Sequence, residues 1–250
     1  MWKRESLMHS TFVIGCKFLA ARPVVYECVR SIKKVYGDSA EIIVIDSDSE
    51  DKSYFSVLRD LGVVVDDAVN HHYTSGAIWC AFEKYIRDSY CFLHDSMTVG
   101  GKIDDYVKND ITSLRYFNSG KFFREYGGGL YPGEFGFDSV EQFEWVNEQF
   151  LLHTSYSIYS IPERFTGLYG STSVCKRETL EKLHKAGFSK VLPTNKHQDQ
   201  GMERAWGIAL ALEGYDIKTH TIGGDCNRNP DTSIIEKVHL SDTVHNRDGN

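Results

Sequence analysis

The stretch EIIVIDSDSED, residues 41–51, joins a short apolar run to an acidic turn rich in serine. Its four consecutive β-branched residues predict a strand buried on both faces, which is typical of a parallel sheet. In such sheets, ligands bind beyond the carboxyl ends of the strands. The acidic residues that follow the run, Asp46 and Asp48, are therefore predicted to face a ligand crevice.

Segments on both sides of this stretch alternate between further strands and helices. The predicted strands are TFVIGC (11–16), VVVDD (63–67) and YCFL (90–93), and the predicted helices span 24–37, 54–62 and 77–88. This alternation predicts parallel βαβ units in one α/β domain, with a doubly wound, mostly parallel sheet flanked by helices.

The second half of the chain has a less regular pattern. Residues 100–165 are rich in aromatic residues and glycine, and we expect irregular structure packed on the sheet, with a helix near 139–152. The remaining predicted elements are a short strand and a helix within 166–187, a loop at 192–200, a helix at 201–214, a late strand at 215–222 and a polar tail at 223–250.

The composition is that of an ordinary globular protein. The 250 residues are 41% hydrophobic and 25% charged, and the formal net charge is −7. That balance speaks against a protein that holds nucleic acid or an anionic membrane by bulk charge. It is compatible with a small phosphorylated ligand, because a metal ion or a helix N-terminus can supply a local positive field.

Six cysteines are present, and none belongs to a CxxC pair: Cys16, Cys28, Cys80, Cys91, Cys175 and Cys226. Most lie in apolar stretches, so free thiols in a reducing compartment explain them better than disulfides do. Neither a signal peptide nor a membrane span is predicted, because the apolar run at 11–16 is too short. We therefore expect a cytoplasmic protein; the sequence does not indicate its oligomeric state.

Two acidic segments at predicted strand ends are candidates for ligand binding. Asp46 and Asp48 could accept hydrogen bonds from a ribose or a uracil N–H, or could form a solvated turn. In His94-Asp95-Ser96, Asp95 suits either a partly hydrated divalent cation or a helix or turn cap. His94 is a metal ligand, a donor to phosphate or a packing residue. The GxGxxG and GxxxxGK[ST] phosphate-binding motifs are absent.

Residues later in the chain are further candidates. Glu203 lies in the first turn of the helix predicted at 201–214, as a general base or as a carboxylate stabilised by the helix dipole. His220, His239 and His245 are each a surface residue or a ligand, and a short apolar run around His239 could return it to the crevice.

Taken in order, these segments resemble the GT-A fold glycosyltransferases, in the manner of the family 2-like and viral or bacterial polysaccharide enzymes. The resemblance covers roughly residues 11–220. TFVIGCKF looks like the first strand of the family, EIIVIDSDSED like its nucleotide-binding segment, and YCFLHDSM like the strand that ends in a DxD metal motif. FTGLYGSTSVCKRETLEKLHKAGF is similar to its acceptor and donor segment, and GMERAWGIALALEGYDI to the helix that carries the base of inverting enzymes.

The resemblance implies a glycosyltransferase that moves a sugar from a UDP- or GDP-sugar to a hydroxyl of a glycan or other acceptor. It implies inversion at the sugar, and a divalent metal, Mn²⁺ or Mg²⁺, at the diphosphate. The site residues it implies are Asp46, Asp48, Cys16, Lys17, Asp95 and Ser96 for the nucleotide, Asp95 and His239 for the metal, Gly170, Trp206 and Tyr131 for the acceptor, and Glu203 and Asp199 for catalysis.

The same resemblance divides the single domain and exposes two departures from the family. Residues 11–99 would form a nucleotide-binding half and 100–222 an acceptor-binding half, followed by the tail at 223–250. The metal motif reads HDS rather than DxD, so one expected carboxylate is missing. The base motif reads Met-Glu-Arg rather than Glu-Asp, and counting back from Gly214 favours Glu203 over Asp199 as the base.

Two other functions stay open at this stage. A sugar-nucleotide pyrophosphorylase would need a glycine-rich basic loop after the first strand, where this chain has GCKFLAARP with a single glycine. A non-catalytic domain that binds a nucleotide-sugar or a glycan would account for the HDS departure. The aromatic residues Tyr126, Tyr131 and Trp145 are either a sugar-stacking surface or part of the core.

Overall fold

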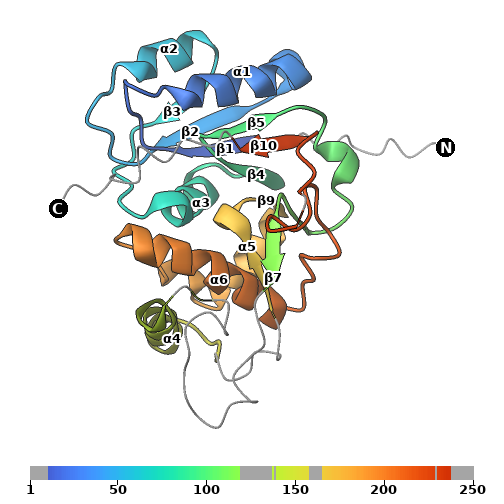
Figure 1. Cartoon of the computed structure of the whole chain (residues 1–250). Helices are drawn as coiled ribbons and strands as arrows, with labels where there is room; N and C mark the ends of the chain where they lie inside the picture. The colour runs from blue at the N-terminus through green and yellow to red at the C-terminus, as the bar shows by residue number, and fades with distance from the viewer. Residues whose placement is uncertain (1–10, 119–136, 138, 158–164, 229, 238–250) are drawn as a thin grey trace.

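The computed structural model describes residues 11–118, 137, 139–157, 165–228 and 230–237, and its centre is a six-stranded sheet in the order β3-β2-β1-β4-β9-β6 (Figure 1). The strands are β1 (Thr11–Cys16), β2 (Ile42–Asp46), β3 (Val64–Asp66), β4 (Ser89–His94), β6 (Ile111–Ser113) and β9 (Ser173–Lys176). The first four are parallel, whereas β9 runs antiparallel to both neighbours. The predicted doubly wound, mostly parallel α/β sheet is thus confirmed.

Helices cover both faces of this sheet. Those within the described residues are α1 (Val24–Tyr36), α2 (Tyr54–Asp60), α3 (Tyr73–Lys84), α4 (Val140–His153), α5 (Arg177–Lys185) and α6 (Lys196–Leu212). In Figure 1, α1 and α2 lie on one side of the sheet and α3, α5 and α6 on the other, with α4 beyond α6.

The alternation of side chains along each strand divides the core between the two faces. In β2, Ile42 and Val44 join the core under α1 and α2, while Ile43 and Ile45 join the core under α3 to α6. All five residues of β2 are buried. A run that is apolar at every position needs cover on both faces, which only an inner strand of the sheet has. This explains why the uninterrupted run at 42–45 forms the inner strand β2.

Short elements complete the described structure. Two small antiparallel sheets pair β5 (Met97–Val99) with β10 (Ile235–Lys237), and β7 (Tyr116–Asn118) with β8 (Thr166–Leu168). The 3₁₀ helices are η1 (Gly37–Ser39), η2 (Asp104–Tyr106), η5 (Tyr169–Ser171) and η6 (Phe188–Lys190). No helix in the described part of the chain is both long and apolar enough to cross a membrane.

Helix α6 begins earlier than the sequence predicts. Its N-cap is Asn195, whose side-chain Oδ1 accepts a hydrogen bond from the Gln198 N–H at 2.9 Å. The loop predicted at 192–200 therefore ends at Asn195, and the predicted helix start at 201 is wrong, because an Asn cap satisfies a first-turn N–H group and starts the helix there. Asp199 consequently lies in the first turn of α6, and Glu203 lies one turn further along.

The C-terminal region also differs from the prediction. The strand expected at 215–222 is not formed; the chain turns there, and only Thr221 makes an isolated bridge, with Ser113. The region expected to be a polar tail instead supplies β10, and the buried Arg115 donates from Nη2 to the Ile235 carbonyl at 2.7 Å. Ile235 is buried and holds this segment on the fold. In the sequence it belongs only to a short, isolated apolar pair, which does not reveal that it is buried.

Candidate functional site

A crevice of about 500 Å³ lies at the carboxyl ends of β1, β2 and β4. Its lining residues are Gly15, Lys17 and Leu19 at the end of β1, Ser47 and Asp48 after β2, Asn70, His71, Tyr73 and Thr74 around the start of α3, His94 and Asp95 at the end of β4, and Thr194, Lys196 and Asp199 around the start of α6. The sheet edge that the sequence predicts to face a ligand is thus the edge that is hollowed.

Asp46, at the end of β2, lies beneath this crevice and not on it. Its carboxylate is buried and accepts hydrogen bonds from the Tyr54 hydroxyl at 2.5 Å and the Ser49 N–H at 3.1 Å, and it forms an ion pair with Lys52. Burial raises the pKa of Asp46, but hydrogen bonds from Lys52, Ser49 and Tyr54 outweigh it, so the pKa is below its usual value. This carboxylate holds the loop that presents Asp48, and its expected contact with the nucleotide stays a prediction.

Asn70 joins the end of β2 to the start of α3. Its Nδ2 donates to Ser47 Oγ at 3.0 Å and to the Tyr73 carbonyl at 2.8 Å, and its Oδ1 accepts from the His72 N–H at 2.9 Å. Because Asn70 is buried and both ends of its amide are bonded, the two walls of the crevice are fixed relative to each other.

Of the other residues expected to contact the nucleotide, some line the crevice and others are buried. Lys17 is exposed and lines the crevice. Cys16 and Ser96 are buried and are not among its lining residues, so their expected contacts with the nucleotide stay predictions. Burial raises the pKa of the Cys16 thiol well above its ordinary value, so this thiol is a core group rather than a ligand contact.

Charged groups of both signs line the crevice. Lys196 Nζ lies 2.6 Å from Asp199 Oδ2, and His71 Nδ1 lies 3.4 Å from Asp48 Oδ2. Lys17 adds a second ammonium group, and the start of α3 adds the positive end of a helix dipole. Neither Lys196 nor Asn70 stands out in the sequence; the capping Asn195 is the signal that could have placed Lys196 at the crevice.

A chain of contacts leads from the crevice into α6. The ring nitrogen Nε2 of His94 lies 2.6 Å from the Gly170 carbonyl oxygen and 3.2 Å from Thr74 Oγ1. The Gly170 N–H in turn donates to Glu203 Oε1 at 2.9 Å. Gly170 has φ +61°, and a Cβ there would lie 2.9 Å from His94 Nε2. Its N–H and its carbonyl are thus both bonded within the protein, and its expected role as an acceptor contact stays a prediction.

Glu203 and Asp199 have different surroundings. The Glu203 side chain is 19% exposed and is not among the crevice residues, and its Oε2 lies 3.2 Å from Arg204 Nη1. Burial raises the pKa of Glu203, and Arg204 together with the Gly170 N–H offsets part of that rise. Asp199, by contrast, lines the crevice.

Trp206, which was expected to contact an acceptor, belongs to the core in this structure. Its side chain is 2% exposed and stacks on Trp79 with ring centroids 5.6 Å apart. Its indole N–H donates to Ser75 Oγ at 3.2 Å, and Phe188 packs edge-on against it. A sugar has no access to this ring, because α3 and η6 already cover it.

Several expected site residues lie outside the described residues, namely Tyr126, Tyr131, His239 and His245. Trp145 lies on α4, partly buried against the core, and His220 is half-buried.

Among the residues that the structure describes, no three His, Cys, Asp or Glu side chains are grouped to hold a metal ion. At the predicted metal position they supply the Asp95 carboxylate, while the His94 imidazole is bonded to Gly170. These two residues do not form a metal site by themselves.

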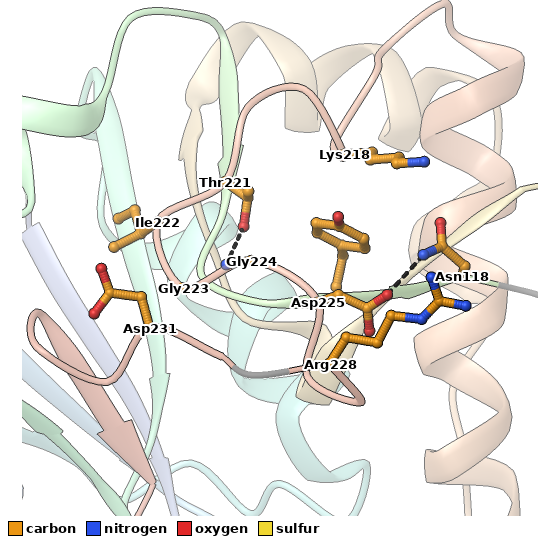
Figure 2. A pocket seen from close by; sticks show the side chains of 10 residues that line it. Asn118, Lys218, Thr221, Ile222, Gly223, Gly224, Asp225, Arg228 and Asp231 are labelled. Carbon is orange, nitrogen blue, oxygen red and sulfur yellow. Dashed lines mark hydrogen bonds between the residues drawn. The ribbon is translucent and has the colours of Figure 1, made fainter.

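A second hollow, of about 480 Å³, lies beside β7 (Figure 2). Lys218 and Arg228 extend along its rim, and Asn118 donates to Asp225 at 2.7 Å. It shares no lining residue with the crevice. Most of its walls come from 218–231, which the sequence predicted as strand and tail, so this hollow was not foreseen.

No family model matches the chain, and no curated protein matches its sequence. Among solved structures, S. aureus TarS 1-349 in complex with UDP matches with 13% identity over 80% of this chain and 55% of that chain, at a TM-score of 0.41. The synthetase of CMP:2-keto-3-deoxy-manno-octonic acid, complexed with CTP, matches with 12% identity over 85% and 88% of the two chains, at 0.45. The glycosyltransferase GlyE of Streptococcus pneumoniae TIGR4 matches with 14% identity over 50% and 32%, at 0.31. The chain spans about half of the length of the TarS segment, and no residue role is carried over from these structures.

Proposed function

We propose that the crevice binds a nucleoside-diphosphate sugar and that the chain transfers the sugar to a hydroxyl group of a glycan or other acceptor. One observation carries this proposal. A single cavity of about 500 Å³ is lined by two ammonium groups and three carboxylates, those of Lys17, Lys196, Asp48, Asp95 and Asp199. The cavity has the volume of a small-molecule site and lies at the edge where α/β sheets bind ligands.

The β2 side of the crevice suits the nucleoside. The Asp48 carboxylate can accept hydrogen bonds from ribose hydroxyls or from a base N–H. Asn70 holds Ser47, and hence this loop, against α3. A pocket wall that is fixed before the ligand arrives loses little conformational entropy on binding.

The β1 and α6 sides suit the diphosphate. Negative charge builds on the diphosphate as the bond to the sugar breaks, so donors and cations held in place lower the barrier. Lys17, Lys196 and the N–H groups at the start of α3 border the same cavity and can supply this stabilisation.

Asp199 is the residue that we assign as general base. It lines the crevice, whereas Glu203, which the spacing of the sequence favours, does not. In the proposed reaction, Asp199 accepts the proton of the acceptor hydroxyl as that oxygen attacks the anomeric carbon, and the diphosphate leaves from the opposite side. A reaction of this geometry inverts the anomeric configuration.

The divalent cation stays part of the proposal as a ligand shared with the substrate. Asp95 would supply one carboxylate, and the diphosphate and water would supply the remaining oxygens, which is how Mg²⁺ is commonly held. Its chemistry would be to neutralise charge on the leaving diphosphate.

Calorimetric titration with UDP and GDP, with and without Mn²⁺, tests binding, and a panel of nucleotide-sugars followed for hydrolysis and transfer tests catalysis. We expect one nucleotide to bind and its sugar conjugate to turn over. Binding without turnover of any donor in the presence of acceptors would indicate a non-catalytic binding domain. Failure of every nucleotide to bind would overturn the proposal.

A further inference from the structure

Glu203 is a partly buried carboxylate that the proposed reaction does not use. It lies on α6 one turn beyond Asp199, and its Oε1 accepts the Gly170 N–H at 2.9 Å. Burying a carboxylate is costly unless it is paired and hydrogen-bonded. Glu203 is both, through Arg204 and Gly170.

Gly170 is the point at which this contact reaches the crevice. Its backbone is left-handed, with φ +61°, and its Cα has no room for a side chain because His94 lies against it. The Glu203 carboxylate holds the N–H on one side of this residue, and the carbonyl on the other side contacts His94 Nε2 at 2.6 Å. Glycine adopts this conformation without steric cost, so the two contacts serve to fix the orientation of its peptide groups.

The contact also fixes the state of the His94 ring. A carbonyl oxygen only accepts hydrogen bonds, so Nε2 must carry the proton. In the neutral ring, Nδ1 is then the acceptor nitrogen. His94 lines the crevice next to Asp95, so its orientation shapes the surface that a substrate meets.

From these contacts we infer that Glu203 is a positioning residue: through the Gly170 backbone it orients the imidazole of His94 in the crevice, while Asp199 removes the proton. This inference rests on the proposed function for its catalytic consequence. The link from Glu203 to His94 is a property of the free protein and can be measured without substrate.

The amide variant separates positioning from proton transfer. In Glu203→Gln the side-chain oxygen can still accept the Gly170 N–H, but the group is no longer a base at any working pH. In Glu203→Ala the acceptor is lost. A matched control is Glu213→Ala at the end of the same helix, which removes a carboxylate that accepts the Tyr156 hydroxyl at 2.8 Å, outside the crevice.

We expect Glu203→Gln to keep most of the wild-type kcat and its pH–rate profile. Glu203→Ala should lower kcat by up to about 10²-fold, the effect that a shift of about 1 Å in the crevice can have on the reacting groups, with a smaller change in KM. Glu213→Ala should stay close to wild type. A loss in Glu203→Gln as large as in Glu203→Ala would overturn the inference and make Glu203 the base, and wild-type kcat in Glu203→Ala would overturn it as well.

The substrate-free measurement is the NMR spectrum of the histidine ring nitrogens, with His94 assigned by its loss in His94→Gln. We expect the Nε2-protonated signature of His94 in wild type and Glu203→Gln, and a changed shift or tautomer in a folded Glu203→Ala. An unchanged His94 signal in Glu203→Ala would overturn the link. Because this readout needs no donor, a failed donor screen would remove the proposed function without deciding this link.

Discussion

Asp199 and Glu203 lie one helical turn apart on α6, and their surroundings give them different chemistry. Asp199 pairs with Lys196 at 2.6 Å on the crevice surface, where an acceptor hydroxyl can approach. The Glu203 side chain is 19% exposed, against 10% for Asp199, but it does not line the crevice and its Oε1 is bonded to the Gly170 N–H. Position relative to the crevice, more than exposure to solvent, therefore decides which carboxylate can take a proton from an acceptor.

Asp199→Asn should lower kcat by about 10²–10⁴-fold, the usual contribution of a general base, with little loss of nucleotide affinity. The measurement is steady-state transfer with the donor identified by the screen, together with calorimetry of nucleotide binding. Asp225→Asn is the matched control, because Asp225 lines the second hollow and is bonded to Asn118. Wild-type turnover in Asp199→Asn would remove this residue as the base.

Asp46 should make stability depend on acidic pH. Its pKa is lowered in the folded state, so its contribution is present above the unfolded value, about 3.9, and is lost as pH falls through the folded value. Asp46→Ala leaves the buried Tyr54 hydroxyl without this acceptor, which should cost about 1–3 kcal/mol at neutral pH. Urea unfolding at pH 7 and pH 3 should show a gap between wild type and variant that narrows at pH 3; a constant gap would contradict this account.

At the scale of elements, the start of α6 is the feature on which the crevice most depends. Asn195 caps the helix, and Lys196 and Asp199 in its first turn line the cavity. Helix α4 begins with the equivalent device: Ser139 Oγ accepts from the Gln142 N–H at 3.1 Å, and the same oxygen lies 2.9 Å from His197 Nε2 at the start of α6. Ser139 is not among the crevice residues, so its loss reaches Lys196 and Asp199 only through His197.

Asn195→Ala and Ser139→Ala should each cost about 1 kcal/mol of unfolding free energy, as loss of an N-cap typically does. Asn195→Ala should weaken nucleotide binding more than Ser139→Ala, because Asn195 caps the turn that carries Lys196 and Asp199, whereas Ser139 contacts that turn only through His197. Denaturant unfolding and calorimetry on the same two variants check both statements. Equal weakening of binding in both variants would show that the effect comes from general destabilisation.

The sequence predicted elements well where their signals are local. The apolar runs of β1, β2 and β4 and the acidic turn at Asp48 emerged correctly because burial on both faces and turn chemistry are written in consecutive residues. The direction of β9, the pairing of β10 with β5 and the burial of Asp46 were not predictable, since each depends on contacts between residues far apart in the chain. Counting back along α6 favours Glu203 as the base, but it is Asp199 that lines the crevice. Spacing alone does not show which side chain faces a cavity, because that depends on how the whole helix docks.

At the scale of the whole molecule, the crevice brings together residues near the start of the described chain and residues of its last α-helix. Lys17 follows β1 and Lys196 opens α6, and α6 packs closely on β8. At Gly207 a Cβ would lie 2.0 Å from the Thr166 carbonyl oxygen, so only glycine permits this packing without a backbone shift. The fold thus brings together two cations that are about 180 positions apart in sequence (196 − 17 = 179).

If a single diphosphate contacts both cations, their contributions to binding cannot be independent. Lys17→Ala and Lys196→Ala should each weaken nucleotide binding, and the double variant should deviate from the sum of the two by about 0.5–3 kcal/mol, the range for residues that share a partner. Lys218, on the second hollow, provides the control. Lys17→Ala combined with Lys218→Ala should be additive to within about 0.5 kcal/mol, because the two residues line separate cavities. The cycle is measured by calorimetry at one fixed salt concentration, since screening alone changes each term. Strict additivity of Lys17 and Lys196 would mean that they do not meet one ligand, and the diphosphate would have to be placed elsewhere in the crevice.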